Sequence, residues 1–251
     1  MTDGIIVLGM HRSGTSSLAR MIHLCGASLG GPVAGANDWN QSGHWESVEG
    51  LAINDLILNL SGGSWDAPPG ALYCDSLLRW KMRRFLGQLH RDGTAIWKDP
   101  RTVLTFPLWK PLLKNDTIIA IFRHPTSVAR SLQRRDGFSL EKGLDLWCHY
   151  NERLLEICQQ EQILHWCDFD RGPEHFVAVL RGLAQQAGLN FNQRALDSYA
   201  PELRTSDAQE EPNSERARNL YAKLRARLKI DPTAECARKT GLGVEHTVTC
   251  Q

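Results

Sequence analysis

The sequence lacks the cysteine patterns that mark disulfide frameworks and structural zinc sites. Seven cysteines occur among the 251 residues, an odd number at irregular spacing, and no Cys-x-x-Cys motif is present. We therefore expect neither a disulfide scaffold nor a zinc site. Most of these thiols are expected to be small buried apolar groups.

The sequence also lacks a long apolar run and an excess of charge of one sign. No apolar run reaches the roughly 18 residues that a membrane-spanning helix needs. Asp3 precedes the first short apolar stretch and no basic segment comes before it, which argues against a signal peptide and predicts a cytoplasmic protein. The 29 basic and 28 acidic residues give a formal net charge of +1, so no overall field favours nucleic acid or a membrane. A site for an anion must therefore be built locally.

Apolar runs of strand length alternate with helical patterns along most of the chain. Strands are expected at residues 5–8, 95–97, 117–122 and 163–166. Helices are expected at residues 14–25, 48–60, 75–90, 102–113, 125–135, 139–159, 173–187 and 215–230. This alternation predicts an α/β fold with a central parallel sheet and helices on both faces, whose ligands bind beyond the carboxyl ends of the strands. We expect one domain over residues 1–251, with a core at about 4–190 and a C-terminal extension at about 191–251.

A glycine-containing loop, Gly9-Met-His-Arg-Ser-Gly-Thr-Ser16, joins the first expected strand to the first expected helix. Backbone N–H groups and a helix N-terminus face an anion at such a place, and the glycines permit a tight turn. The spacing resembles the phosphate loop G-x-x-x-x-G-K-[ST], so the fold class is narrowed to a three-layer fold of the P-loop type. Thr15 stands where ATP-using loops have lysine, which disfavours ATP chemistry. The side chains that could contact an anion here are those of Arg12, Ser13, Thr15 and Ser16. The alternative is a plain strand–turn–helix corner.

A second candidate anion site follows the apolar run at residues 117–122. Arg123 ends this run, Pro125 suits the first turn of a helix, and Ser131 comes eight positions after Arg123. In a helix starting near Pro125, both side chains could reach one phosphate. The alternative is a capped amphipathic helix with solvated arginines.

Together the two segments resemble the motifs of the sulfotransferase superfamily that uses 3'-phosphoadenosine 5'-phosphosulfate (PAPS). The first resembles the loop for the 5'-phosphosulfate, and Phe122-Arg-His-Pro-x5-Ser131 resembles the motif for the 3'-phosphate. Trp97-Lys-Asp-Pro-Arg101 is similar to a Lys-Asp-Pro segment of the bacterial, carbohydrate- and tyrosylprotein-like branch. The resemblance covers roughly residues 4–190.

The resemblance implies PAPS as the donor and 3'-phosphoadenosine 5'-phosphate (PAP) as the product. No metal is expected, because a sulfuryl group carries less charge than a phosphoryl group and no metal-binding pattern is present. It assigns the 5'-phosphosulfate to Arg12, Ser13, Gly14, Thr15 and Ser16, and the 3'-phosphate to Arg123 and Ser131. A late basic contact to the 3'-phosphate would come from Arg204 or from Arg238 and Lys239. Asp168 and Phe169 resemble an acidic motif that follows a strand in this family.

The catalytic base is expected to be Glu46, in the segment Gly43-His-Trp-Glu46, because related enzymes place a catalytic glutamate in a comparable stretch. A carboxylate there can act as a base if burial or a neighbour tunes its pKa. The alternatives are that Glu46 simply favours a helix N-terminus, or that His44 is the base.

Sulfuryl transfer also needs positive charge on the leaving oxygen, by the same physics as phosphoryl transfer. Lys98 and Arg12 are the candidates, and the alternative for Lys98 is a surface lysine at a strand end. Arg101 could bind the acceptor, brace Glu46 or brace Asp99. His11 could flank the acceptor.

Several aromatic and basic residues have two open interpretations. Tryptophans beside the variable loops could form walls for a ring-shaped acceptor or could pack in the core; these are Trp39, Trp45, Trp65 and Trp109. The basic helix around Arg79-Trp-Lys-Met-Arg-Arg84 could be a solvated face or an acceptor site. Specificity is expected to lie in residues 26–43, 61–73 and the C-terminal stretch.

The function predicted from these features is transfer of a sulfuryl group from PAPS to a hydroxyl or amine of a carbohydrate, lipid or small-molecule acceptor. No nucleic acid partner and no transmembrane segment are expected. The runner-up is a P-loop kinase or nucleotide phosphotransferase, in which Asp168 would imitate a magnesium-holding aspartate. A third possibility is a PAPS- or PAP-binding module without catalysis.

Overall fold

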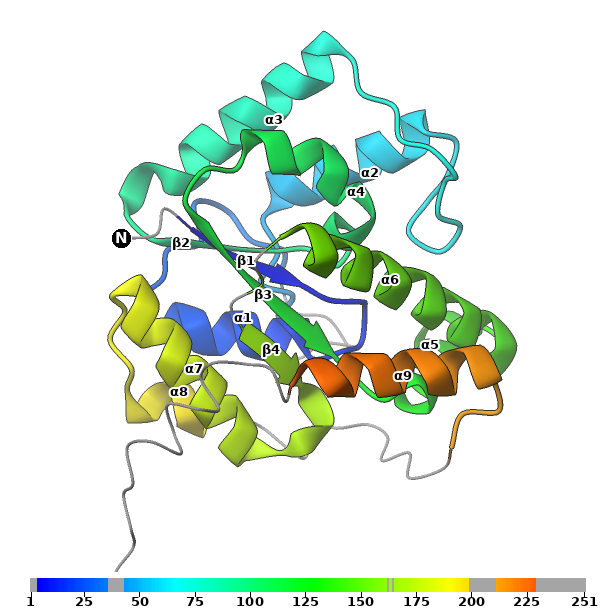
Figure 1. The fold of residues 1–251 in the computed structure, drawn as a ribbon. Helices are drawn as coiled ribbons and strands as arrows, with labels where there is room; N and C mark the ends of the chain where they lie inside the picture. The colour runs from blue at the N-terminus through cyan, green and yellow to red at the C-terminus, as the bar shows by residue number, and fades with distance from the viewer. Residues whose placement is uncertain (1–3, 36–42, 162, 164, 199–210, 229–251) are drawn as a thin grey trace, which may run out of the picture.

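The computed structural model of the chain describes residues 4–35, 43–161, 163, 165–198 and 211–228. Within these residues one parallel sheet has the strand order β2-β1-β3-β4 (Figure 1). Its strands are β1 (Gly4–Leu8), β2 (Ala95–Lys98), β3 (Asp116–Phe122) and β4 (His165–Asp168). The α/β architecture with a parallel central sheet is therefore confirmed.

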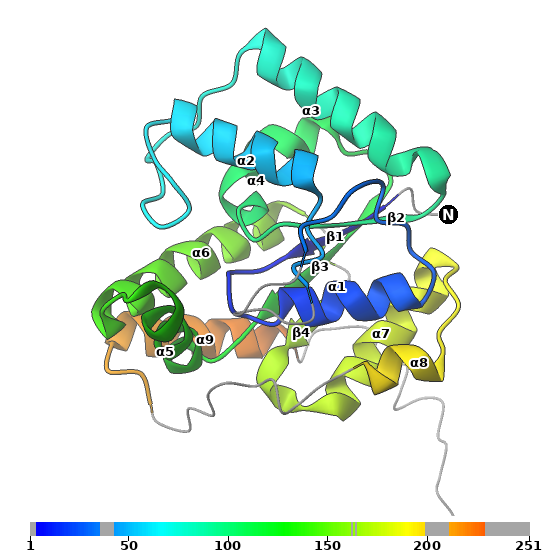
Figure 2. The same ribbon diagram turned by 180° about the vertical axis from the view of Figure 1, so that it is seen from behind.

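Helices cover both faces of the sheet and make three layers (Figures 1 and 2). Alternate residues of β1 point to opposite faces: Ile5 and Val7 contact one core cluster, and Ile6 and Leu8 contact the other. The first face carries α1 (Thr15–Leu24), α7 (Pro173–Ala187) and α8 (Gln193–Asp197). The second face carries α2 (Val48–Leu60), α3 (Ser76–Leu89), α4 (Thr102–Trp109), α5 (Pro125–Asp136), α6 (Leu140–Gln160) and α9 (Glu215–Arg227).

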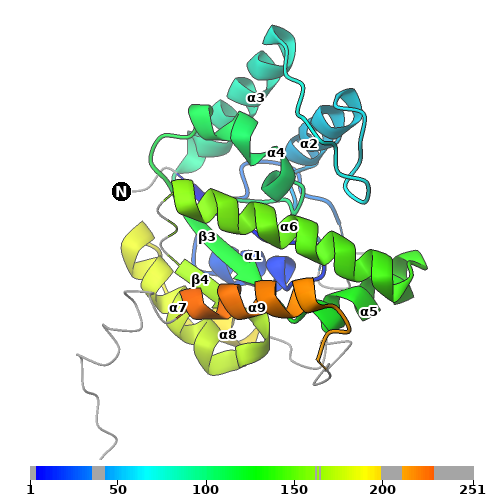
Figure 3. The ribbon, with the colours of Figure 1, turned by 45° about the vertical axis from the view of Figure 1, so that its right-hand side comes forward.

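The C-terminal helix α9 lies beside α6 on the outer side of the second face (Figure 3). Arg216 of α9 forms ion pairs with Asp145 and Glu152 of α6. Leu220 and Leu224 of α9 are buried in the same core cluster. The segment therefore belongs to the packed body of the molecule. None of the helices described is both long and apolar enough to cross a lipid bilayer.

The structure corrects two of the expected elements and adds one that was not expected. The helix expected at residues 102–113 ends at Trp109 and continues as a 3₁₀ turn at Lys110–Leu112, because Pro111 has no N–H to donate to an α-helical bond. The last strand was expected at residues 163–166 and instead spans His165–Asp168. The apolar pattern did not predict these bounds, because the first and last residues of the strand, His165 and Asp168, are polar. The short helix α8 was not expected; the side chain of Asn192 caps it by accepting from the N–H of Ala195.

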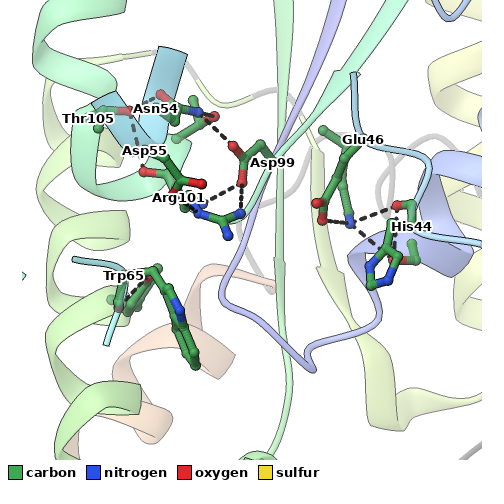
Figure 4. A network of polar contacts seen from close by, with 12 residues as sticks. His44, Glu46, Asn54, Asp55, Trp65, Asp99, Arg101 and Thr105 are labelled. Carbon is green, nitrogen blue, oxygen red and sulfur yellow. Dashed lines mark hydrogen bonds and ion pairs between the residues drawn. The ribbon is translucent and has the colours of Figure 1, made fainter. Parts of the chain in front are cut away.

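A buried asparagine joins α2 to the segment that follows β2 (Figure 4). The amide of Asn54 donates to the carboxylate of Asp99 at 2.9 Å and to the hydroxyl of Thr102 at 3.0 Å. Its carbonyl oxygen accepts from the hydroxyl of Thr105 at 2.7 Å and from the indole N–H of Trp109 at 2.9 Å. Asn54 is fully buried, so these four bonds replace all contact with water.

We predict that Asn54→Leu lowers the free energy of unfolding by about 3 kcal/mol or more, because several buried polar groups lose their partners at once. Urea unfolding measures the loss. Asn59→Leu is the matched control, because Asn59 lies exposed on the same helix and its replacement should cost little. Equal losses in the two variants would show that the buried bonds contribute nothing special.

Candidate functional site

The strand order brings three chain segments together at the carboxyl edge of the sheet. β1 lies between β2 and β3, and the chain leaves β1 for β2 on one side before crossing to β3 on the other. Such a switch point opens a crevice in which α/β proteins bind ligands. The loop after β1 is therefore flanked by Lys98 at the end of β2 and by Arg123 after β3.

The loop after β1 has the backbone of an anion-binding turn. Gly9 cannot carry a side chain, since a Cβ atom would lie 2.4 Å from the carbonyl oxygen of Ile121 in β3. Gly14 has φ +86° and precedes α1 with no side-chain hydrogen bond to cap the helix. Arg12 also has a positive φ, 65°, which is rare for a residue with a side chain and marks a constrained site. The buried hydroxyl of Ser13 has no hydrogen-bond partner among the residues that the structure describes, so it can bond to a ligand oxygen.

The two predicted anion sites adjoin each other. Arg12 donates from Nε to the hydroxyl of Ser131 at 2.8 Å, and Arg123 donates to the backbone carbonyl of Arg12 at 3.4 Å. Burial, together with the nearby charges of Arg135 and Arg123, lowers the pKa of Arg12 to about 10. A cation disfavoured in this way is stabilised by an anion. From the sequence, the two sites were assigned to opposite ends of one nucleotide. In the structure they are in direct contact, through Arg12 with Ser131 and Arg123 with the backbone of Arg12.

The ring of Phe169 contacts both the loop after β1 and the side chain of Arg123. Phe169, directly after β4, lies so close to Gly14 that an added Cβ would be 1.9 Å from the ring. The guanidinium carbon of Arg123 lies 4.9 Å from the centre of the same ring, a cation–π contact. Asp170 accepts from the backbone N–H of His124 at 2.7 Å and from Arg123 at 3.4 Å. This turn therefore sets the distance between the loop and Arg123. The sequence pointed to Phe169 only through the family resemblance and gave no sign of Asp170.

On the other side of the loop, Lys98 and Glu46 form a buried ion pair (Figure 4). The Nζ of Lys98 lies 2.6 Å from Oε1 of Glu46 and also donates to the hydroxyl of Ser16 at 3.0 Å. A third bond from Nζ reaches the backbone carbonyl of His44 at 2.9 Å. Ser47, not Glu46, caps α2, so the simple helix-terminus interpretation of Glu46 does not hold. Lys98 is buried, so it is not a surface lysine.

Arg101 pairs with carboxylates other than that of Glu46, which pairs with Lys98. It forms ion pairs with Asp55 at 2.6 Å and with Asp99 at 3.2 Å. Burial raises the pKa of Asp99, and the charge of Arg101 opposes that rise. Of the three roles open to Arg101, the geometry supports that of bracing Asp99.

His11 lies in the phosphate loop and is packed among aromatic rings. Its ring centre is 4.6 Å from that of Trp65 and 5.9 Å from that of Tyr150. The hydroxyl of Tyr150 donates to the backbone carbonyl of Trp65 at 2.9 Å and holds that loop in place. Burial keeps the pKa of His11 well below its usual value, and the charges of Arg101, Arg135, Lys98 and Arg12 act in the same direction. His11 is therefore neutral at physiological pH.

The candidate tryptophans lie in different environments. Trp109 is fully buried and bonds Asn54, so its alternative role as an acceptor wall is wrong. Trp65 lies against His11 and stays a candidate wall, whereas Trp45 lies against His23 on α1, 5.4 Å between ring centres. Trp39, and the candidates Arg204, Arg238 and Lys239 for a late phosphate contact, lie outside the described residues.

Asp168, which the kinase hypothesis needs as a metal-holding aspartate, has a structural role at the end of β4. Its carboxylate accepts from the N–H of Asp170 at 3.0 Å and caps the turn that carries Phe169. Burial is the main reason that its pKa rises to about 6. Among the described residues, no group of three or more His, Cys, Asp or Glu side chains could hold a metal ion.

The raised pKa of Asp168 predicts a pH-dependent stability. Between the unfolded pKa and about 6, the folded state holds a proton that the unfolded state has lost, so stability falls as the pH rises. Urea unfolding at each pH measures the free energy of unfolding of Asp168→Asn and of the unsubstituted chain. Between about pH 4 and about pH 8, the difference between the two should shift by about 3 kcal/mol in favour of the variant. Asn keeps the capping oxygen and cannot ionise. Asp92→Asn, at an exposed position, should show no such trend. Parallel pH curves for Asp168→Asn and the unsubstituted chain would refute the assignment.

Comparison with known proteins finds solved structures with a similar fold. No protein-family model and no curated protein matches the sequence. The structure is similar to that of a sulfotransferase domain from the curacin biosynthetic pathway, with a TM-score of 0.54, 14% identity, and coverage of 88% of this chain and 96% of that chain. It is also similar to a sulfotransferase domain from the Synechococcus PCC 7002 olefin synthase, with a TM-score of 0.51, 16% identity, and coverage of 96% and 94%. The chain has the fold of these sulfotransferase domains.

Proposed function

We propose that this chain is a sulfotransferase that moves a sulfuryl group from PAPS to a hydroxyl or amine of a carbohydrate, lipid or small-molecule acceptor. The observation that carries the proposal is the contact of Arg12 with Ser131 beside Arg123. This contact joins the loop after β1, which has Thr15 where ATP-binding loops have lysine, to a second group of side chains that could bind another phosphate. PAPS carries two such anionic groups, on the 5' and 3' oxygens of one nucleoside.

The residues present fit the donor. The unpartnered hydroxyl of Ser13 and the uncapped N-terminus of α1 suit the 5'-phosphosulfate, with Gly14, Thr15 and Ser16 in the first turn. Arg123 and Ser131 suit the 3'-phosphate. Arg12 lies at the boundary between the two, where it can contact either anion.

In the proposed reaction, the acceptor oxygen or nitrogen attacks sulfur in line with the bond to the 5'-phosphate oxygen. The new bond to sulfur forms as the old one breaks, Glu46 takes the acceptor proton, and PAP leaves with the bridging oxygen. Lys98 and Arg12 stabilise the charge that grows on that oxygen. The ion pair of Lys98 with Glu46, and its bond to Ser16, support this division of roles. His44 stays the alternative base, and burial lowers the pKa of its ring.

A P-loop kinase is a weaker alternative. Thr15 takes the place of the ATP-type lysine and is buried, with its methyl group near Gly9. Arg123 and Ser131 have no role in a kinase, and Asp168 caps a turn. A module that only binds PAP would have no need for the buried Glu46–Lys98 pair.

We predict that PAP binds about a hundredfold more tightly than AMP, since two contacts to the 3'-phosphate are worth about 3 kcal/mol. Arg123→Gln should remove most of this selectivity while leaving AMP affinity nearly unchanged. Isothermal titration with PAP, AMP and ATP plus magnesium measures all three affinities. Arg130→Gln, one position from Ser131 on α5, is the control. Tighter binding of ATP with magnesium than of PAP would favour the kinase.

Glu46→Gln should lower kcat about 10²- to 10⁴-fold, the usual contribution of a positioned base, and should leave PAP affinity within about twofold. An acceptor screen with labelled PAPS supplies the assay, and PAP titration shows that the variant is folded. Glu49→Gln, an exposed glutamate on α2, is the matched control. Full activity of Glu46→Gln would exclude Glu46 as the base and turn attention to His44.

A further inference from the structure

Helix α3 has two chemically different faces. One face is buried against the second core cluster and consists of Leu78, Met82, Phe85, Leu86 and Leu89. The opposite face is exposed and repeats at three- and four-residue spacing, with Leu77, Trp80, Lys81 and Arg84 in one stripe. Tyr73, just before the helix, is exposed as well. We name these five exposed residues, Tyr73, Leu77, Trp80, Lys81 and Arg84, the α3 outer face.

Large apolar side chains of the α3 outer face are in contact with solvent. Leu77 is 60% exposed, Trp80 53% and Tyr73 49%. Seven large hydrophobic residues are strongly exposed in the described parts of the chain, and six of them fall between Val48 and Trp80. The exposure is therefore concentrated in the α2–α3 region of the chain, and contiguous exposed apolar surface is typical of interaction sites.

The charge of α3 has one sign. The helix carries Arg79, Lys81, Arg83 and Arg84 and no acidic residue between Ser76 and Leu89. None of these four cations forms an ion pair with another described residue. The guanidinium of Arg84 lies 5.7 Å from the centre of the Trp80 ring, so charge and aromatic surface occupy the same spot. Although the whole chain has a net charge of only +1, this face is locally basic.

We propose that the α3 outer face docks reversibly on an anionic lipid surface. Tryptophan and tyrosine favour the boundary between headgroups and acyl chains, and exposed leucine adds apolar contact there. Lysine and arginine are attracted to anionic headgroups. The inference is independent of the proposed sulfotransferase reaction.

A lipid surface fits this face better than a second copy of the chain. A two-fold interface would place the same basic helix on both sides, and the like charges would oppose each other. Helix α3 lies at the outer edge of the molecule (Figures 1 and 3). A planar lipid surface can contact a helix at such an edge without a matching groove.

Co-sedimentation of the full chain with phosphatidylcholine vesicles, with and without phosphatidylserine, tests the proposal. We expect binding only when phosphatidylserine is present, and weaker binding at high salt. Lys81→Glu with Arg84→Glu should reduce partitioning about tenfold or more. Trp80→Ser with Leu77→Ser should also reduce it, since the apolar contact is lost.

Matched variants on other helices separate the face from general charge and hydrophobicity. Arg153→Glu with Lys223→Glu changes the net charge by the same amount at exposed positions of α6 and α9. Leu140→Ser removes an exposed leucine on α6. Both should bind vesicles like the unsubstituted chain, and equal loss in these controls would overturn the proposal. So would binding to polyglutamate without binding to vesicles, which would assign the face to an acidic protein.

Discussion

Burial of positive charge at the carboxyl edge of the sheet is the constraint on which the rest of the site depends. Lys98 and Arg123 are among the most buried charged residues of the chain, and a buried cation is costly unless it is paired. Each therefore fixes a partner from a distant segment. Glu46 is brought to Lys98 from the stretch before α2, and Asp170 is brought to Arg123 from the turn after β4. In the proposed reaction, donor binding would add two anionic groups to this edge.

The sheet converts these pairings into one surface. Because β1 lies between β2 and β3, the loop after β1 separates Lys98 from Arg123. Gly9 and Gly14 allow the loop to approach β3 and Phe169 more closely than any other residue could. The catalytic side proposed for Glu46 and the phosphate side proposed for Arg123 thus flank one closely packed loop, which suits chemistry that consists mainly of positioning.

The α2–α3 region contributes to three properties of the molecule. Its buried side holds the carboxylate of Asp99 through Asn54 and thereby supports the end of β2. Its connecting loop carries Trp65 to His11 in the phosphate loop. Its outer side presents the basic and apolar residues of α3.

The sequence by itself determined the local structure and the chemical types of the side chains that could bind an anion. Continuous apolar runs predicted β1 and β3, and the glycine spacing between β1 and α1 predicted a phosphate loop there. These features depend on neighbours in the chain, so a local pattern records them. Only the tertiary structure decided which groups meet: Arg12 with Ser131 across 119 positions, and Lys98 with Glu46 across 52. It also placed Trp109 in the core and Trp65 at the loop. Such contacts depend on strand order and packing, which no local periodicity encodes.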